Sequence, residues 1–147
     1  MTTTFPHHYE VNLSWPRQGG AELYAAAAPP IAGGAPMQFG GRDSWWSPEH
    51  LLLSSLSLCL MTTFEAIAAK ARLKVVRGDC RAVATLDHDE GGLGFTALGL
   101  HVEVEVAPDD AERAARLLAS AKKHCLVANA LRLPVTLDVA VVTSAAA

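Results

Sequence analysis

The chain has 147 residues, of which 50% are apolar and 18% are charged, and its formal net charge is -3. This length suits one domain with a real hydrophobic core, so we expect a single domain over residues 1–147. The 12 Lys and Arg residues are scattered along the sequence, whereas nucleic-acid-binding proteins concentrate positive charge on one face. The composition therefore predicts a soluble globular protein and argues against nucleic-acid binding.

The N-terminal segment carries His7, His8 and Glu10 where a signal peptide would have a basic start and an apolar stretch. The longest uncharged run, residues 51–64, is shorter than the roughly 20 apolar residues that cross a bilayer. We therefore expect a cytoplasmic protein with no membrane partner. Its cysteines are expected to be reduced at rest, so any disulfide would be transient and functional.

The first half of the chain contains two predicted strands, a loop and a helix. Alternating apolar and polar residues predict a strand over residues 9–15, and residues 22–28 are interpreted as the return strand. Three Pro and four Gly between residues 29 and 41 predict a loop without regular structure. Ser47 and Pro48 are typical of a helix start, so a helix is expected from Pro48 to about Arg72. Apolar residues cover every side of its first four turns, which indicates a central helix enclosed on all faces.

The second half alternates between strands and helices. Residues 79–86 and 95–106 are predicted strands joined by a turn-rich segment. A second helix is expected from Pro108 to near His124, because its acidic start and lysine-containing end suit the helix dipole. A short segment and a final strand over residues 135–142 complete the chain. This order predicts an α+β domain with segregated layers.

Two thiols lie in or next to the predicted helices. Cys59 follows Glu49 by ten residues on the first helix, and Cys125 comes directly after the second. The stretch Trp46-Ser-Pro-Glu-His-Leu-Leu up to Cys59, together with His124-Cys-Leu-Val-Ala-Asn-Ala-Leu, resembles the OsmC/Ohr family of osmotically inducible and organic hydroperoxide resistance proteins. The resemblance covers residues 9–142. It implies an OsmC-like fold, with antiparallel sheets packed on a long central helix, and an intertwined homodimer with active sites at the interface.

The same resemblance implies a thiol-dependent peroxidase that reduces organic hydroperoxides without a cofactor. Cys59 would attack the peroxide and become a sulfenic acid, and Cys125 would resolve it into an intramolecular disulfide. A dithiol reductant, with a lipoyl-type dithiol as one candidate, would reopen that bond. This chemistry suits the residues, because peroxide attack requires a thiolate and a nearby thiol prevents further oxidation.

The family pairs an arginine with the glutamate that Glu49 matches, and two arginines remain candidates. Arg17 is slightly preferred, because its glycine-containing turn is similar to the one that carries the arginine in the hydroperoxide resistance branch. Arg42 is nearer to Glu49 in the sequence. Glu49 itself lies about 15 Å along the helix axis from Cys59, at about 1.5 Å per residue. At this distance Glu49 cannot touch the Cys59 sulfur from its own helix, and a partner chain would be a way to bring the two groups into one site.

The local sequence favours the other thiol. Cys125 lies beside Lys122 and Lys123 and is expected at the start of a short helix, and both features lower a thiol pKa. Cys59 lies in mid-helix among leucines, where burial would raise its pKa. We therefore expect Cys59 to act as the nucleophile only if an arginine is brought to it from elsewhere.

Departures from the family pattern keep a second function open. Leu126 stands where many relatives have Pro after the second cysteine, and the loop over residues 29–46 is unlike that of the hydroperoxide resistance branch. These features favour a general OsmC-like subgroup. The alternative is a non-enzymatic OsmC-like stress protein that binds an apolar small molecule, and a weaker third option is an acyl or thiol transferase.

Other candidate residues have structural interpretations. Cys80 is interpreted as a structural thiol in a strand, and the six His residues show no metal-like spacing, so no metal site is expected. Trp45, Trp46 and Phe39 are expected to close a core edge or to line a pocket for an apolar peroxide.

Overall fold

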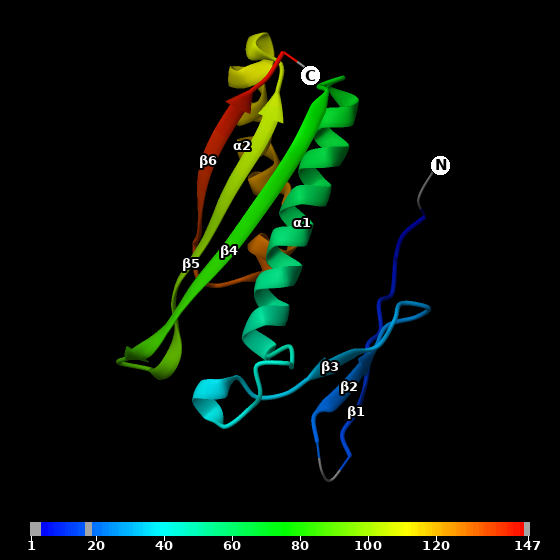
Figure 1. Cartoon of the computed structure of the whole chain (residues 1–147), viewed down its shortest axis with the longest axis vertical. Coiled ribbons are helices and arrows are strands. Elements are labelled where there is room, and N and C mark those ends of the chain that lie inside the picture. The colour runs from blue at the N-terminus through cyan, green and yellow to red at the C-terminus, as the bar shows by residue number, and fades with distance from the viewer. Residues whose placement is uncertain (1–3, 17–18, 146–147) are drawn as a thin grey trace. The chain divides into compact units, whose positions relative to one another are not determined.

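The computed structural model describes residues 4–16 and 19–145. The chain separates into two compact units, Met1–Leu51 and Leu52–Ala147. Each unit contains a three-stranded sheet, as Figure 1 shows. The single domain expected from the chain length stays a prediction.

The first unit contains strands β1 (Asn12–Ser14), β2 (Ala21–Tyr24) and β3 (Ile31–Gly33), which form an antiparallel sheet in that order. The prediction that residues 29–41 lack regular structure was wrong, because they contain β3 and a 3-10 helix, Met37–Phe39. Glycine is used in β3 for close packing: a Cβ on Gly33 would lie 2.6 Å from the Leu23 side chain. A side chain at position 33 would therefore collide with its neighbour on β2.

Helix α1 spans Pro48–Lys70. The Ser47 hydroxyl accepts a hydrogen bond of 3.2 Å from the backbone N–H of His50, which caps the helix start as predicted. Arg72 ends the helical path with a positive φ of 55°, and the N–H of Leu73 donates to the carbonyl of Ala68 at 2.9 Å. Both ends of the predicted helix therefore agree with the structure to within two residues.

The surface of α1 is apolar on all sides, but only one stripe of it is buried. The buried residues recur every fourth position: Leu56, Leu60, Phe64 and Ala68. Leu58, on another side, is 66% exposed. The residues that the structure describes therefore do not provide the expected enclosure on all faces. By length and composition alone, with a mean hydropathy of 1.7, α1 would also be long enough to cross a membrane.

The second sheet contains β4 (Val75–Asp89), β5 (Gly92–Val106) and β6 (Val135–Thr143). Strands β4 and β5 form an antiparallel hairpin, whereas β5 and β6 are parallel. The expectation of antiparallel sheets was therefore wrong for β5 and β6. Helices α2 (Ala111–His124) and α3 (Leu126–Ala130) connect these two strands, and parallel strands require such a long crossover.

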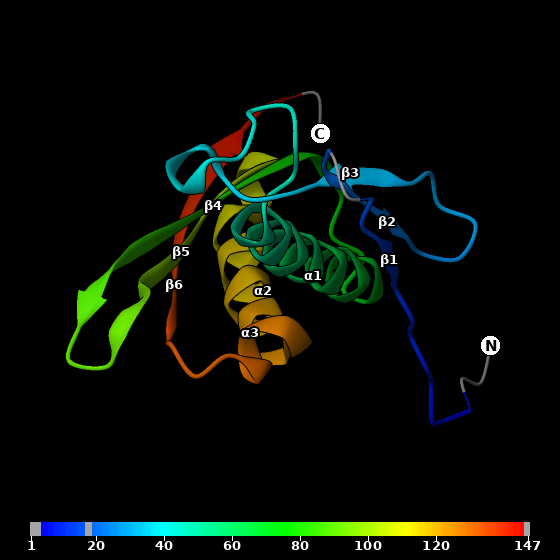
Figure 2. The same ribbon diagram turned by 90° about the horizontal axis from the view of Figure 1, so that it is seen from below.

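The core of the second unit lies between this sheet and the helices. Alternate residues of β5 are buried, as predicted from their period-2 pattern: Leu98, Leu100, Val102, Val104 and Val106. They belong to one cluster with the buried stripe of α1 and with Ala114, Leu118 and Ala121 of α2. Figures 1 and 2 show α1 and α2 on the same face of the β4–β5–β6 sheet. The predicted α+β class with segregated layers agrees with this arrangement.

Candidate functional site

The structure brings Cys59 and Cys125 together. Cys59 lies in the middle of α1 and is half-buried, whereas Cys125 joins α2 to α3 and is fully buried. Both are free thiols. Their side chains are hydrogen-bonded to each other, with the Cys125 thiol as donor and the Cys59 sulfur as acceptor. The two thiols that the family resemblance identifies are therefore partners in the structure.

The pKa of the Cys59 thiol is lowered below its ordinary value. Burial acts to raise the pKa, but four hydrogen-bond donors outweigh it. In order of effect they are the backbone N–H of Val127, the Cys125 thiol, the backbone N–H of Leu126 and the Thr63 side chain. Hydrogen bonds to a charged form favour that form, so these donors stabilise a thiolate at Cys59.

The pKa of the Cys125 thiol is raised. Burial is the largest cause, and the neighbouring Cys59 adds to it, while the backbone N–H groups of Ala128 and Val127 oppose it. The prediction that Cys125 would be the more acidic thiol was therefore wrong. The first N–H groups of α3 act on the Cys59 sulfur, and the burial of Cys125 outweighs the donors near its own sulfur.

The lowered pKa of Cys59 shows that burial is not the only influence on this thiol, whereas the need for an arginine stays a prediction, since Arg17 lies outside the described residues. Burial still disfavours the Cys59 thiolate, but uncharged donors from α1 and from the Cys125–Val127 segment overcome that effect. A thiolate is the form that reacts with peroxides and other electrophiles. Cys59 is therefore the more acidic thiol of the pair, and Cys125 the less acidic one.

Glu49 lies in the first turn of α1, and one of its carboxylate oxygens, Oε2, is buried. Within residues 4–16 and 19–145, this oxygen has no hydrogen-bond partner. Arg42 does not provide one, because its guanidinium group lies over the Trp45 ring, 5.0 Å from the ring centroid. Arg17 lies outside the described residues. The structure therefore leaves Glu49 with an unmet need for a donor within the part of the chain it describes.

A cavity of about 320 Å³ lies within the first unit. Its lining is almost entirely apolar and includes Trp15, Phe39 and Trp46, together with leucine side chains of β1 and β2. Phe39, Trp45 and Trp46 were expected either to close a core edge or to line a pocket, and Phe39 and Trp46 line this one. Trp45 is not part of this lining; its ring packs closely over Gly34, where a Cβ would lie 2.4 Å from it. The cavity suits an apolar group of modest size.

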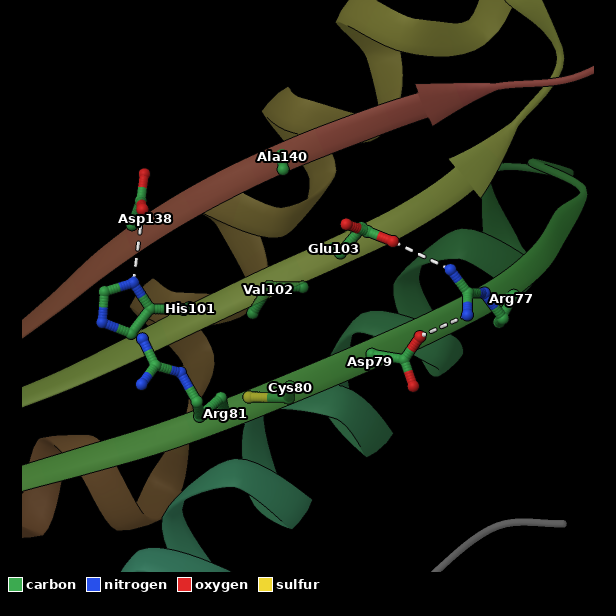
Figure 3. Close-up of a pocket in the computed structure, with 9 residues that line it drawn as sticks. All are labelled: Arg77, Asp79, Cys80, Arg81, His101, Val102, Glu103, Asp138 and Ala140. Carbon is green, nitrogen blue, oxygen red and sulfur yellow. Dashed lines mark hydrogen bonds and ion pairs between the residues drawn. The ribbon is translucent and has the colours of Figure 1, made fainter.

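Cys80 keeps its structural interpretation. It pairs with Val102 across β4 and β5 and packs against the core, and burial raises its pKa. Figure 3 shows Cys80 at the edge of a pocket of about 390 Å³ on the second sheet. The charged groups in this pocket are largely paired with each other: Arg77 with Asp79 and Glu103, and His101 with Asp138.

Over the described ranges, 4–16 and 19–145, no group of three or more His, Cys, Asp or Glu side chains is placed to hold a metal ion.

Sequence reasoning missed the groups that act on Cys59. Thr63 lies one helical turn after Cys59, so it shares a face of α1 with the thiol, and this spacing offered a usable signal. The N–H groups of Val127 and Leu126 offered none, because a backbone donor has no signature in the sequence. Only the packing of α3 against α1 brings these donors to the sulfur.

Comparison with known proteins supports the family resemblance. Residues 41–140 match the family model described as OsmC-like protein. The structure is similar to that of an OsmC-like protein of unknown function from Vibrio cholerae, with 19% sequence identity and a TM-score of 0.84, covering 92% of this chain and 100% of that one. A search of curated proteins found no match.

Two further solved structures have the same fold. An organic hydroperoxide resistance protein from Elizabethkingia anophelis, with crystallant-derived thiocyanate bound, has 19% identity and a TM-score of 0.75, covering 97% of this chain and 100% of that one. An OsmC-like protein from Mycoplasma pneumoniae has 16% identity and a TM-score of 0.80, covering 94% of this chain and 99% of that one. The family model spans well over half of the sequence, and the chain therefore belongs to the OsmC-like protein family.

Proposed function

We propose that this chain is a thiol-dependent peroxidase that reduces organic hydroperoxides. The observation that carries the proposal is the hydrogen-bonded pair of Cys59 and Cys125, in which the pKa of one thiol is lowered and that of the other is raised. Several structural neighbours are organic hydroperoxide resistance proteins, which supports this choice of substrate class.

The first step uses the Cys59 thiolate. Its sulfur attacks the terminal oxygen of the hydroperoxide, so that an S–O bond forms and the O–O bond breaks. The organic alkoxide leaves and takes up a proton to become an alcohol, and Cys59 becomes a sulfenic acid. The donors that stabilise the thiolate before attack are the backbone N–H groups of α3, the Cys125 thiol and Thr63.

The second step uses Cys125. Its sulfur attacks the Cys59 sulfenic acid, an S–S bond forms, and the hydroxyl group leaves as water with the Cys125 thiol proton. A dithiol reductant then supplies two electrons and two protons, which restores both thiols and leaves the reductant as a disulfide. Contact between the two side chains favours this step, because a sulfenic acid is protected from further oxidation only when a thiol traps it quickly.

Glu49 and an arginine complete the proposed site. A buried carboxylate oxygen without a donor is costly, and a guanidinium group satisfies a carboxylate with two parallel hydrogen bonds. Arg17 is the preferred partner and Arg42 the alternative, which is already engaged with the Trp45 ring. In this proposal the pair orients the hydroperoxide, while neutral donors lower the pKa of Cys59 against the effect of burial.

The proposed enzyme acts as a cytoplasmic homodimer. The support for a dimer is the surface of α1, where Leu58 is 66% exposed beside the thiol that the proposal makes catalytic. A second copy of this helix would cover that surface and provide the enclosure that the apolar sequence of α1 predicts.

Mass spectrometry tests the peroxidase proposal directly. After one equivalent of cumene hydroperoxide, we expect a disulfide between Cys59 and Cys125, while Cys80 remains a free thiol. A chain that consumes no peroxide and keeps all three thiols free would contradict the proposal. Quantifying the alcohol product against the disulfide checks the stoichiometry, which should be one to one in the absence of a reductant.

The second candidate is a non-enzymatic protein that binds an apolar small molecule. The apolar cavity of about 320 Å³ in the first unit favours it, as does the unknown function of the Vibrio cholerae relative. Quenching of tryptophan fluorescence by an apolar ligand, with no peroxide consumption under any reductant, would select this function.

A further inference from the structure

We propose that a pocket bounded by the end of α2, by α3 and by the start of β6 binds a small organic oxyanion, that is, a phosphate or carboxylate with a short apolar portion. The pocket has a volume of about 520 Å³, which is within the usual range for small-molecule sites. Three basic side chains line it, Lys122, Lys123 and Arg132, and no acidic residue does. In Figure 2, α3 lies beside the end of α2, and the loop to β6 leaves from it.

The pocket gathers three cations of this unit that have no salt-bridge partner among the described residues, as Lys70, Arg72, Lys74 and Arg81 also have none. Lys122, Lys123 and Arg132 form no ion pair with any carboxylate that the structure describes. By contrast, Arg77, Arg113 and Arg116 each lie beside an Asp or Glu. Three positive charges therefore line one concavity in a chain with a net charge of -3, and a bound anion would reduce the repulsion between them.

The dipole of α2 accounts for only part of this cluster. Lysines at a helix end are favoured by the last backbone carbonyls, but here other donors already use two of those groups. The carbonyl of Lys122 accepts from the N–H of Cys125 at 3.3 Å, and that of Lys123 accepts from the Asn129 side chain at 3.0 Å. Arg132 lies beyond α3, so the α2 dipole does not explain its place.

The apolar residues that line the pocket indicate that the ligand also has an apolar portion. Leu131 and Leu133 are half-buried, Val135 is 5% exposed, and all three line the pocket. A hydrated inorganic ion would leave this apolar surface unused. An oxyanion with an attached ring or short chain would place its charge among the cations and its apolar part against these residues. Arginine suits either head group, because its planar donors match both phosphate and carboxylate.

Isothermal titration calorimetry of the full chain at low ionic strength tests the proposal, with phenyl phosphate and benzoate as probes and inorganic phosphate as the reference. We expect saturable binding of one organic probe per chain, with a Kd below about 1 mM and tighter than that of inorganic phosphate. The better probe identifies the head group. Shifts of the Ala128 and Asn129 amide signals in NMR spectra would place the probe at this pocket.

Variants that each remove one positive charge distinguish specific binding in the pocket from general electrostatic attraction to the chain. Arg132→Gln and Lys123→Gln should each weaken binding at least about tenfold, because each removes a charge-assisted hydrogen bond. Lys74→Gln removes the same charge from an exposed position outside the pocket and should change Kd by less than about twofold. Absence of saturable binding, or an equal loss in all three variants, would overturn the proposal. The assay contains no peroxide, so its outcome is independent of the proposed peroxidase function.

Discussion

The thiol of Cys125 donates a hydrogen bond to the sulfur of Cys59. This contact stabilises the thiolate at Cys59 and holds the proton on Cys125, so it gives two identical side chains different roles. Burial acts to raise the pKa of both thiols. The Val127 N–H lowers the pKa of both, so the difference arises because the Leu126 N–H, Thr63 and the Cys125 thiol act on Cys59 while Cys59 raises the pKa of Cys125.

Removing the donor at position 125 should make Cys59 less acidic. In Cys125→Ala the hydrogen bond is lost, so the pKa of Cys59 should rise and its alkylation by iodoacetamide should slow at pH values below that pKa. In Cys125→Ser a hydroxyl donor remains, and most of the effect should be retained. The pH dependence of the alkylation rate, followed by mass spectrometry of the Cys59 peptide, measures both. An unchanged profile in the alanine variant would contradict the assigned hydrogen bond.

Thr63 and Thr62 form a matched pair for testing the second side-chain donor. Thr63 donates to the Cys59 sulfur, whereas the hydroxyl of Thr62 donates to the backbone carbonyl of Leu58 at 2.9 Å. Thr63→Val should therefore raise the pKa of Cys59, and Thr63→Ser should restore it. Thr62→Val should leave it unchanged. Thiolate absorbance at 240 nm against pH gives the comparison, and equal effects of the two valine variants would refute the role of Thr63.

The proposed catalytic role of Cys59 predicts a sharp contrast with Cys80. Cys59→Ser should abolish peroxide consumption, because serine is not a nucleophile of comparable strength at neutral pH. Cys80→Ser should retain it, since Cys80 lies in β4 and burial raises its pKa. Peroxide loss in the presence of a dithiol is the measurement. Equal loss of activity in both variants would show that these roles are misassigned.

The exposed side of α1 should determine whether the proposed dimer forms. Leu58→Glu places a charge on a residue that is 66% exposed in the single chain, so folding of the chain should be little affected while association is prevented. Size-exclusion chromatography with light scattering should then give the monomer mass. Ala119→Glu, at an exposed position of α2, is the control and should remain dimeric. If the unsubstituted chain also gives the monomer mass, the dimer proposal is contradicted.

The buried stripe of α1 should determine stability. Leu60 is fully buried, so Leu60→Ala should destabilise the fold by about 2–5 kcal/mol through lost burial and a residual cavity. Denaturant unfolding followed by circular dichroism measures this change. A loss below about 0.5 kcal/mol, the usual range for surface substitutions, would mean that the side chain is not part of the core.

The sequence by itself determined the elements whose signals are local. Ser47 and Pro48 specified the start of α1, because a capping hydroxyl and a proline act within one turn. The alternation along β5 specified its buried face, since successive side chains of a strand point to opposite sides. The two cysteine motifs were also visible in the sequence and identified the family.

The tertiary structure decided which thiol is the acidic one. Local reasoning favoured Cys125, because its basic neighbours and the expected helix start are close in sequence. The structure instead directs N–H groups of Val127 and Leu126 to Cys59 and buries Cys125 completely. The pKa of a buried thiol depends on the donors that surround it in space. Those donors come from a segment far along the chain, so only the packing of α3 against α1 could assign the two roles.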